Sequence, residues 1–196
     1  MSAQWRRWET APRFMPLLGA LIGALGGAVY WLGAQIWPTS IAVMLAMLAT
    51  ALLPAASPHN LPGADIRVVS FVFAVLVKYN ALMALSAANL PFALPANLAL
   101  PLIMIAGHAA SSALVVSSKP ASHGDLGIAL AIGFAPAVLL GLPGLIGLVA
   151  AIAARFAFIG YARRNGAPVS PAVLDTTQQL TEVCFYLGAL ATWAYV

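Results

Sequence analysis

Charge is scarce in this sequence. Only 7% of its 196 residues are charged, whereas 62% are hydrophobic. Soluble domains carry about 25% charged residues, so this composition excludes an ordinary soluble fold and indicates a membrane protein. The net charge of +4 requires no nucleic acid, because basic residues beside anionic lipid account for it. We therefore expect the lipid bilayer as the main partner of the chain and no nucleic acid.

Cysteine and acidic residues are also few. The one cysteine, Cys184, excludes an internal disulfide and a cysteine metal cluster, and we expect it to pack as a small apolar residue. Sites that transfer phosphoryl groups gather several carboxylates around Mg²⁺. Here the acids are spread over five segments, so the residues alone predict neither a metal site nor a catalytic site. These acids are Glu9, Asp65, Asp125, Asp175 and Glu182.

Long apolar runs fill the rest of the chain. An α-helix rises about 1.5 Å per residue, so crossing a hydrocarbon core of about 30 Å takes roughly 20 residues. The runs do not alternate apolar with polar residues, which excludes barrel strands. They predict an all-α polytopic membrane bundle of about seven transmembrane helices. It forms a single domain, 1–196, in which 1–14 is a cytoplasmic or interfacial segment. The predicted spans are 15–37, 41–56, 68–88, 96–117, 126–142, 145–162 and 172–195, of which the second and fifth are short.

Charge in the connecting segments lies on one side only. Basic residues precede the first, third, fifth and seventh runs, whereas the other connections carry no charge. Cytoplasmic loops of membrane proteins collect Lys and Arg, so this pattern places the N-terminus in the cytoplasm and the C-terminus outside. We expect a multi-pass protein of the bacterial inner membrane. The basic residues that carry the argument are Arg6, Arg7, Arg13, Arg67, Lys119, Arg163 and Arg164.

Three glycines recur at every fourth position of the first run, at Gly19, Gly23 and Gly27. Such a stripe lets a second helix approach closely and favours van der Waals packing in lipid. The sequence predicts helix packing inside the bundle, with a dimerisation face as the alternative.

Two charged residues lie deep in the predicted spans. Lys78 is near the middle of the third span, and Glu182 is at a similar depth in the seventh. An ionisable side chain inside a membrane is costly and needs a partner, so we expect these two to form an ion pair. The alternative is that Lys78 extends its amine towards the interface while Glu182 is protonated or hydrogen-bonded to a polar neighbour.

Other polar residues accompany them. Gln178 and Gln179 form a polar patch with Glu182, and Asp175 lies one turn nearer the cytoplasm. His108, in the middle of the fourth span, could ligate haem or a pigment through its imidazole. A hydrogen-bonded histidine of the bundle is the simpler interpretation, because no second histidine stands at helical spacing.

Four segments, 13–23, 71–85, 119–127 and 167–183, carry a likeness to one family. They resemble the cobalamin synthase family (adenosylcobinamide-GDP ribazoletransferase). Residues 13–23 (RFMPLLGALIG) are similar to that family's first-helix pattern, and 71–85 is similar to its lysine-bearing helix. Residues 119–127 (KPASHGDLG) resemble one of its loops. The strongest likeness is 167–183 (APVSPAVLDTTQQLTEV), which keeps register with a family segment. The resemblance implies a membrane enzyme that joins α-ribazole to adenosylcobinamide-GDP with Mg²⁺ and releases GMP.

The departures from the family pattern fall on residues that this chemistry needs. Ala172 and Gln179 stand where the family has acidic residues, and Ser122 replaces a loop arginine. The family also carries a long acidic stretch between the second and third spans, where this chain has only 56–67, with Asp65 as a possible remnant. A transferase without these carboxylates has little to hold Mg²⁺ against phosphate oxygens.

Three functions follow from this comparison. The first, which the missing acids favour, is a pseudoenzyme of this fold that is a subunit or assembly partner of a membrane complex, associated with other membrane proteins or as a homo-oligomer. It has no cofactor. The second is a Mg²⁺-dependent ribazoletransferase of cobalamin biosynthesis that uses Asp65, Asp175 and Glu182. The third is a small transporter or cofactor-binding module in which Lys78, His108 and Glu182 line a path or hold a ligand.

Overall fold

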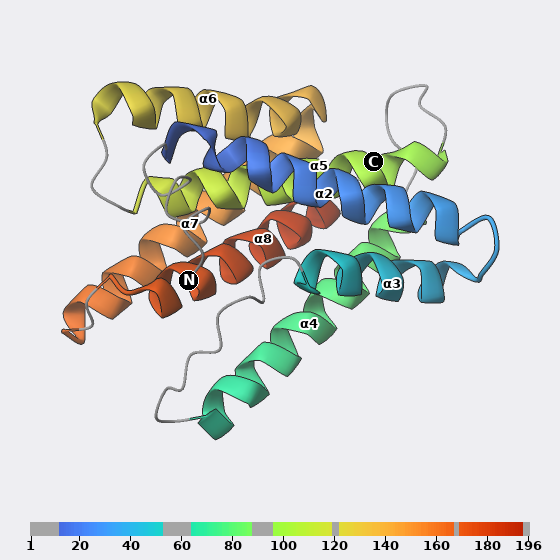
Figure 1. The fold of residues 1–196 in the computed structure, drawn as a ribbon, viewed down its shortest axis with the longest axis horizontal. Helices are drawn as coiled ribbons and strands as arrows, with labels where there is room; N and C mark the ends of the chain where they lie inside the picture. The colour runs from blue at the N-terminus through green and yellow to red at the C-terminus, as the bar shows by residue number, and fades with distance from the viewer. Residues whose placement is uncertain (1–11, 53–63, 88–95, 119–121, 167–168, 194–196) are drawn as a thin grey trace, which may run out of the picture.

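The described part of the chain is helical. A computed structural model describes residues 12–52, 64–87, 96–118, 122–166 and 169–193 (Figure 1). A short 3-10 helix, η1 (Pro12–Phe14), leads into the first of seven α-helices in these ranges. The α-helices are α2 (Met15–Gly33), α3 (Thr39–Leu52), α4 (Ala64–Ser86), α5 (Ala96–Val116), α6 (His123–Leu139), α7 (Leu142–Arg164) and α8 (Pro171–Trp193).

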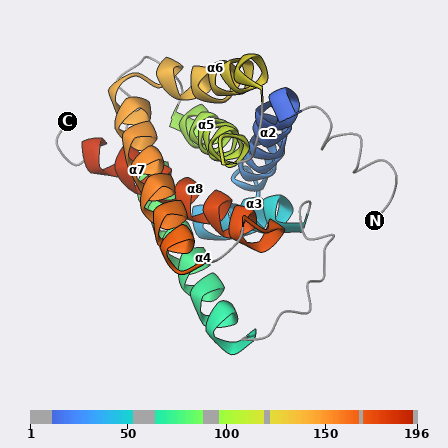
Figure 2. The ribbon, with the colours of Figure 1, turned by 90° about the vertical axis from the view of Figure 1, so that its left-hand side faces the viewer.

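Helix α5 is the centre of the bundle. Most successive helices run in opposite directions along the long axis of the molecule, whereas α4 crosses this axis obliquely (Figure 1). Viewed from its end, α5 is enclosed by α2, α6, α7 and α8 (Figure 2). In the most apolar 18-residue stretch of Leu98–Val116, 89% of the residues are buried, compared with 33% in Pro12–Gly33 and in Leu142–Arg164. The polar side chains that α5 carries are therefore shielded on most sides by other helices.

The helices have the composition of membrane spans. Among the described residues, three helices are long and apolar enough to cross a membrane: Pro12–Gly33, Leu98–Val116 and Leu142–Arg164. Three shorter apolar helical segments accompany them: Thr39–Ala51, Val72–Ser86 and His123–Leu139. These features confirm the all-α fold and agree with the polytopic membrane bundle that the sequence predicts.

The helix ends differ from the predicted spans by a few residues, for local reasons. Helix α6 begins at His123, three residues before the predicted span, because the Ser122 side chain accepts a hydrogen bond from the Asp125 backbone amide at 3.1 Å. Helix α7 begins directly after Gly141, whose φ of 69° makes the turn from α6. Capping and turn residues therefore set the starts of α6 and α7, and average hydropathy does not reveal such residues.

The glycine stripe of α2 lies against α5. A Cβ atom added at Gly23 would lie 2.5 Å from the Met104 carbonyl oxygen, and one at Gly27 would lie 2.8 Å from the Cα atom of Pro101. A Cβ atom added at Gly19 would lie 2.5 Å from the His108 carbonyl oxygen. The two backbones therefore pack directly against each other, and α5 occupies this face of α2 within one chain.

Candidate functional site

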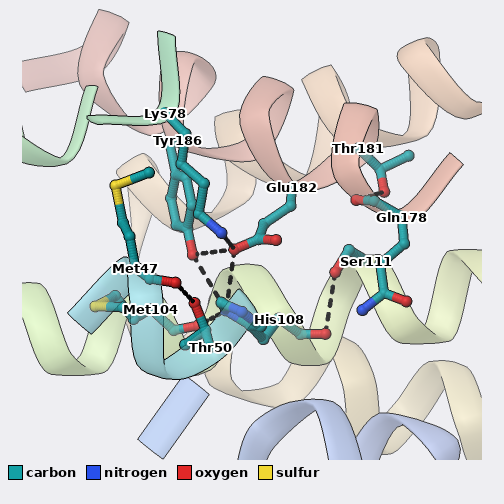
Figure 3. A network of polar contacts seen from close by, with 10 residues as sticks. All are labelled: Met47, Thr50, Lys78, Met104, His108, Ser111, Gln178, Thr181, Glu182 and Tyr186. Carbon is teal, nitrogen blue, oxygen red and sulfur yellow. Dashed lines mark hydrogen bonds and ion pairs between the residues drawn. The ribbon is translucent and has the colours of Figure 1, made fainter. Parts of the chain in front are cut away.

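Four polar side chains from three helices meet in the interior. Lys78 extends from α4, His108 from α5, and Glu182 and Tyr186 from α8 (Figure 3). The Lys78 Nζ atom lies 2.7 Å from Glu182 Oε1, and the Tyr186 hydroxyl donates a 2.8 Å hydrogen bond to the same oxygen. His108 Nδ1 lies 3.0 Å from it. We call these four residues the polar cluster; one carboxylate oxygen is its centre.

The cluster is buried, which determines its energetics. The side chains of Lys78 and Glu182 are 8% and 1% exposed. Removing two charges from water is expensive, and their attraction offsets that cost only when the geometry is good and further hydrogen bonds are made. Both conditions hold for Glu182. The Lys78 amine also lies 5.9 Å from the centre of the Tyr186 ring, within the range of a cation–π contact.

The structure brings together Lys78 and Glu182, which the sequence placed at similar depth. It also makes His108 a hydrogen-bonded residue, with Nδ1 3.0 Å from the Met104 carbonyl oxygen. Sequence reasoning missed Tyr186. The signal was present, because residues four apart face the same side of a helix and Tyr186 is four residues after Glu182.

A cavity of about 610 Å³ adjoins the polar cluster. We call it the α4–α8 cavity, although α2, α3 and α5 also line it. Most of its lining is apolar, from residues such as Met44, Leu48 and Leu76. One part is polar, and there the structure gathers all five residues that the sequence singled out as intramembrane polar groups: Lys78, His108, Gln178, Gln179 and Glu182.

The described residues do not fit the Mg²⁺ ion that the family resemblance implies. Asp175 is exposed and lies two turns before Glu182 in α8, about 10 Å along the helix axis. Asp65 is in the first turn of α4, but its side chain lies outside the described residues. Glu182 is already engaged by Lys78 and Tyr186. Within the described ranges, no three or more His, Cys, Asp or Glu residues gather as a metal site.

One end of the bundle collects further polar contacts. The Arg155 guanidinium donates a 2.5 Å hydrogen bond to the Ser117 carbonyl oxygen and a 3.2 Å bond to Ser118 Oγ, so it caps the end of α5. Arg13 and Asp125 lie 3.9 Å apart and join the starts of α2 and α6. Sequence reasoning missed Arg155, because it is a single charge within an apolar run.

The comparisons with known proteins agree on one family. A family model described as cobalamin-5-phosphate synthase matches residues 2–57. An adenosylcobinamide-GDP ribazoletransferase of Shewanella frigidimarina is 30% identical over 228 residues, which covers 92% of this chain and 84% of that protein. One from Ralstonia nicotianae is 28% identical over 93% of this chain and 84% of its own length. A third, from Leptothrix cholodnii, is 48% identical over 42 residues, 21% of this chain and 16% of that protein.

The length of these matches is also informative. The Shewanella match takes in 228 residues, more than the 196 of this chain, so that relative has stretches that this chain lacks. No solved structure matches the chain. The identity and coverage are sufficient to place the sequence: the chain belongs to the adenosylcobinamide-GDP ribazoletransferase family.

Proposed function

We propose that this chain is a non-catalytic family member that holds a ligand in the α4–α8 cavity. The supporting observation is that five polar residues, contributed by three helices, line the same cavity. Ligand sites in proteins are mostly apolar cavities of about 300–1,000 Å³ with a few polar groups that fix orientation, and this cavity fits that description. The names of the relatives suggest adenosylcobinamide-GDP as the ligand to test first.

The absence of transfer chemistry is part of the proposal. Glu182 accepts bonds from Lys78 and Tyr186 through Oε1, so one of its two carboxylate oxygens is already engaged. A single carboxylate, neutralised by an amine at 2.7 Å, offers little to a divalent cation that carries phosphate oxygens.

We also propose a multi-pass location in the bacterial inner membrane, with the N-terminus in the cytoplasm. Leu142, Val149 and Phe156 recur every seven residues on α7, and all three are more than half exposed. Such a stripe suits contact with lipid tails.

A role as subunit or assembly partner of a membrane complex remains a prediction. Extraction in gentle detergent, followed by mass spectrometry, would identify a partner or a homo-oligomer.

The proposal is tested with purified full-length protein in detergent. We expect it to retain adenosylcobinamide-GDP in equilibrium dialysis and to release no GMP when α-ribazole and Mg²⁺ are added. Ala51→Phe, which fills part of the cavity lining, should weaken retention at least tenfold. The Ralstonia nicotianae relative, assayed in parallel, is the positive control for GMP release. Failure to retain the compound, or GMP release above the protein-free background, contradicts the proposal.

The second candidate is the reaction named for the relatives. The similarity extends over 92% of this chain, which favours it. If the chain is an active transferase that uses the remaining acids, Asp65→Asn and Asp175→Asn should each abolish Mg²⁺-dependent GMP release while the variants remain folded.

A further inference from the structure

We propose that the exposed face of α7 binds one anionic phospholipid of the cytoplasmic leaflet. Arg163 and Arg164 bind its phosphate, and its acyl chains lie along the apolar stripe of the same helix. This inference rests on the proposed membrane location and is independent of the ligand proposed for the α4–α8 cavity. It assigns a class of lipid to residues that the proposed function does not use.

The apolar stripe of α7 leads to a basic residue. Leu142, Val149 and Phe156 are 59%, 62% and 64% exposed, and they recur every seven residues, which is about two helical turns. The next position at this spacing is Arg163, which is exposed, and Arg164 follows it in the last turn. Apolar and basic side chains therefore follow one line on the helix surface, in the order in which a phospholipid presents its chains and its phosphate.

The length of this line matches a bilayer. Helix α7 lies at the periphery of the bundle (Figure 2), and only 33% of its most apolar 18-residue stretch is buried. From Leu142 to Arg163 the helix rises about 32 Å, and the hydrocarbon core of a bilayer is about 30 Å thick. With Leu142 at one interface, Arg163 is therefore at the level of the headgroups on the other side. An acyl chain that starts beside Arg163 would pass Phe156 on its way to the middle of the bilayer.

The positive charge at the end of α7 is not balanced by the described part of the protein. No carboxylate in the described ranges forms an ion pair with Arg163 or Arg164. At the same end of the bundle Arg13 differs, because it lies 3.9 Å from Asp125. A guanidinium group binds phosphate through two parallel N–H donors, so two exposed arginines at the level of the headgroups suit a phosphodiester.

These features favour a lipid over a soluble anion. A soluble phosphate would contact the arginines only, whereas a phospholipid contacts both the arginines and the apolar stripe that leads to them. The cytoplasmic leaflet carries anionic lipids, and basic residues beside a membrane span bind them. Arg155 of the same helix is already bonded to Ser117 and Ser118 at the end of α5, so the proposed site consists of Arg163 and Arg164.

The experiment is native mass spectrometry of the purified full-length protein in a non-ionic detergent. The probes are phosphatidylglycerol and phosphatidylcholine with identical acyl chains. We expect one phosphatidylglycerol per chain to bind roughly tenfold more tightly than phosphatidylcholine. A basic residue beside anionic lipid contributes about a fivefold gain in affinity, so Arg163→Gln should lose about that factor, and Arg163→Gln/Arg164→Gln should lose the preference. Arg13→Gln is the matched control, because it removes one positive charge at the same end of the bundle and should leave the preference unchanged.

The inference is overturned if the wild-type protein binds the two lipids equally, a comparison that needs no variant. It is also overturned if the double variant keeps the preference, or if Arg13→Gln loses as much affinity as Arg163→Gln. Displacement of the lipid by an equal concentration of inorganic phosphate would show that the arginines bind phosphate alone, against the proposal.

The membrane location is tested separately, by alkaline extraction of vesicles made from phosphatidylcholine alone. A protein that stays in these vesicles but shows no lipid preference would keep the proposed location and remove only this inference.

Discussion

The two sides of α5 are built in opposite ways. On the α2 side, glycines allow backbone to lie against backbone, and Gly23 has no room for a Cβ atom beside Met104. On the α8 side, α5 contributes His108 to a cluster of charged and polar groups beside a cavity of about 610 Å³. The first interface is dense, and the glycines of α2 contact mainly backbone atoms of α5 there. The second combines buried charge with open volume, which is costly for stability and useful for a ligand.

The largest effect should come from breaking the ion pair. Glu182→Gln leaves the Lys78 amine buried without its counter-charge, and such a loss costs about 3–5 kcal/mol. Lys78→Met leaves the carboxylate uncompensated and should cost a similar amount. The double variant Lys78→Met/Glu182→Leu should recover part of the loss, because it removes both charges. Unfolding in mixed detergents measures the free energies; a double variant no more stable than the single variants would contradict a coupled pair.

Gly23→Ala tests the dense side of α5. The added methyl group would meet the Met104 carbonyl oxygen at 2.5 Å and the Ile105 Cα atom at 2.7 Å, and both are backbone atoms that cannot rotate away. Overpacking of this kind costs about 1–3 kcal/mol, so the thermal midpoint in detergent should fall.

Gly160→Ala is the matched control for this substitution. A Cβ atom at Gly160 in α7 meets nothing within 4 Å among the described residues. The variant should be as stable as the wild type or up to about 1 kcal/mol more stable, because alanine is the better helix former. Equal losses in the two variants would show that contact with α5 is not the reason for the effect at Gly23.

The smallest effect should come from the end of α5. Arg155→Met removes two hydrogen bonds to Ser117 and Ser118 and should cost about 1 kcal/mol, since the guanidinium is only partly buried. Arg155→Lys should recover some of this loss, because an ammonium group can still donate to the Ser117 carbonyl. Hydrogen exchange of the last turn of α5 measures the change directly. Unchanged exchange in Arg155→Met would show that this cap does not stabilise the helix end.

Much of the fold was predictable because lipid imposes a simple rule on sequence. Only segments that satisfy their own backbone hydrogen bonds cross a bilayer, so an apolar run of sufficient length predicts a helix. The α5 range, Ala96–Val116, agrees with the predicted span 96–117 to within one residue. Hydropathy failed at the start of α6, where Ser122 caps the helix, because capping depends on one side-chain oxygen and not on average polarity.

The polar cluster was only half predictable. Depth along two helices was sufficient to pair Lys78 with Glu182, since a buried charge needs a partner. Depth does not tell which way a side chain points, so the inclusion of His108 required the packing of α5 against α8. Tyr186 could have been found from the sequence, because it lies four residues after Glu182 on the same helix.

The sequence by itself indicated a lipid environment, the approximate limits of the helices in the described residues, and which few polar residues would need partners. These properties follow from composition and hydropathy along the chain, because transfer into lipid is nearly additive over residues. Only the tertiary structure decided that Lys78, His108 and Tyr186 would meet at one carboxylate oxygen of Glu182 beside a cavity. That outcome depends on how α4, α5 and α8 rotate and approach each other, and such rotations are set by contacts between residues far apart in the chain.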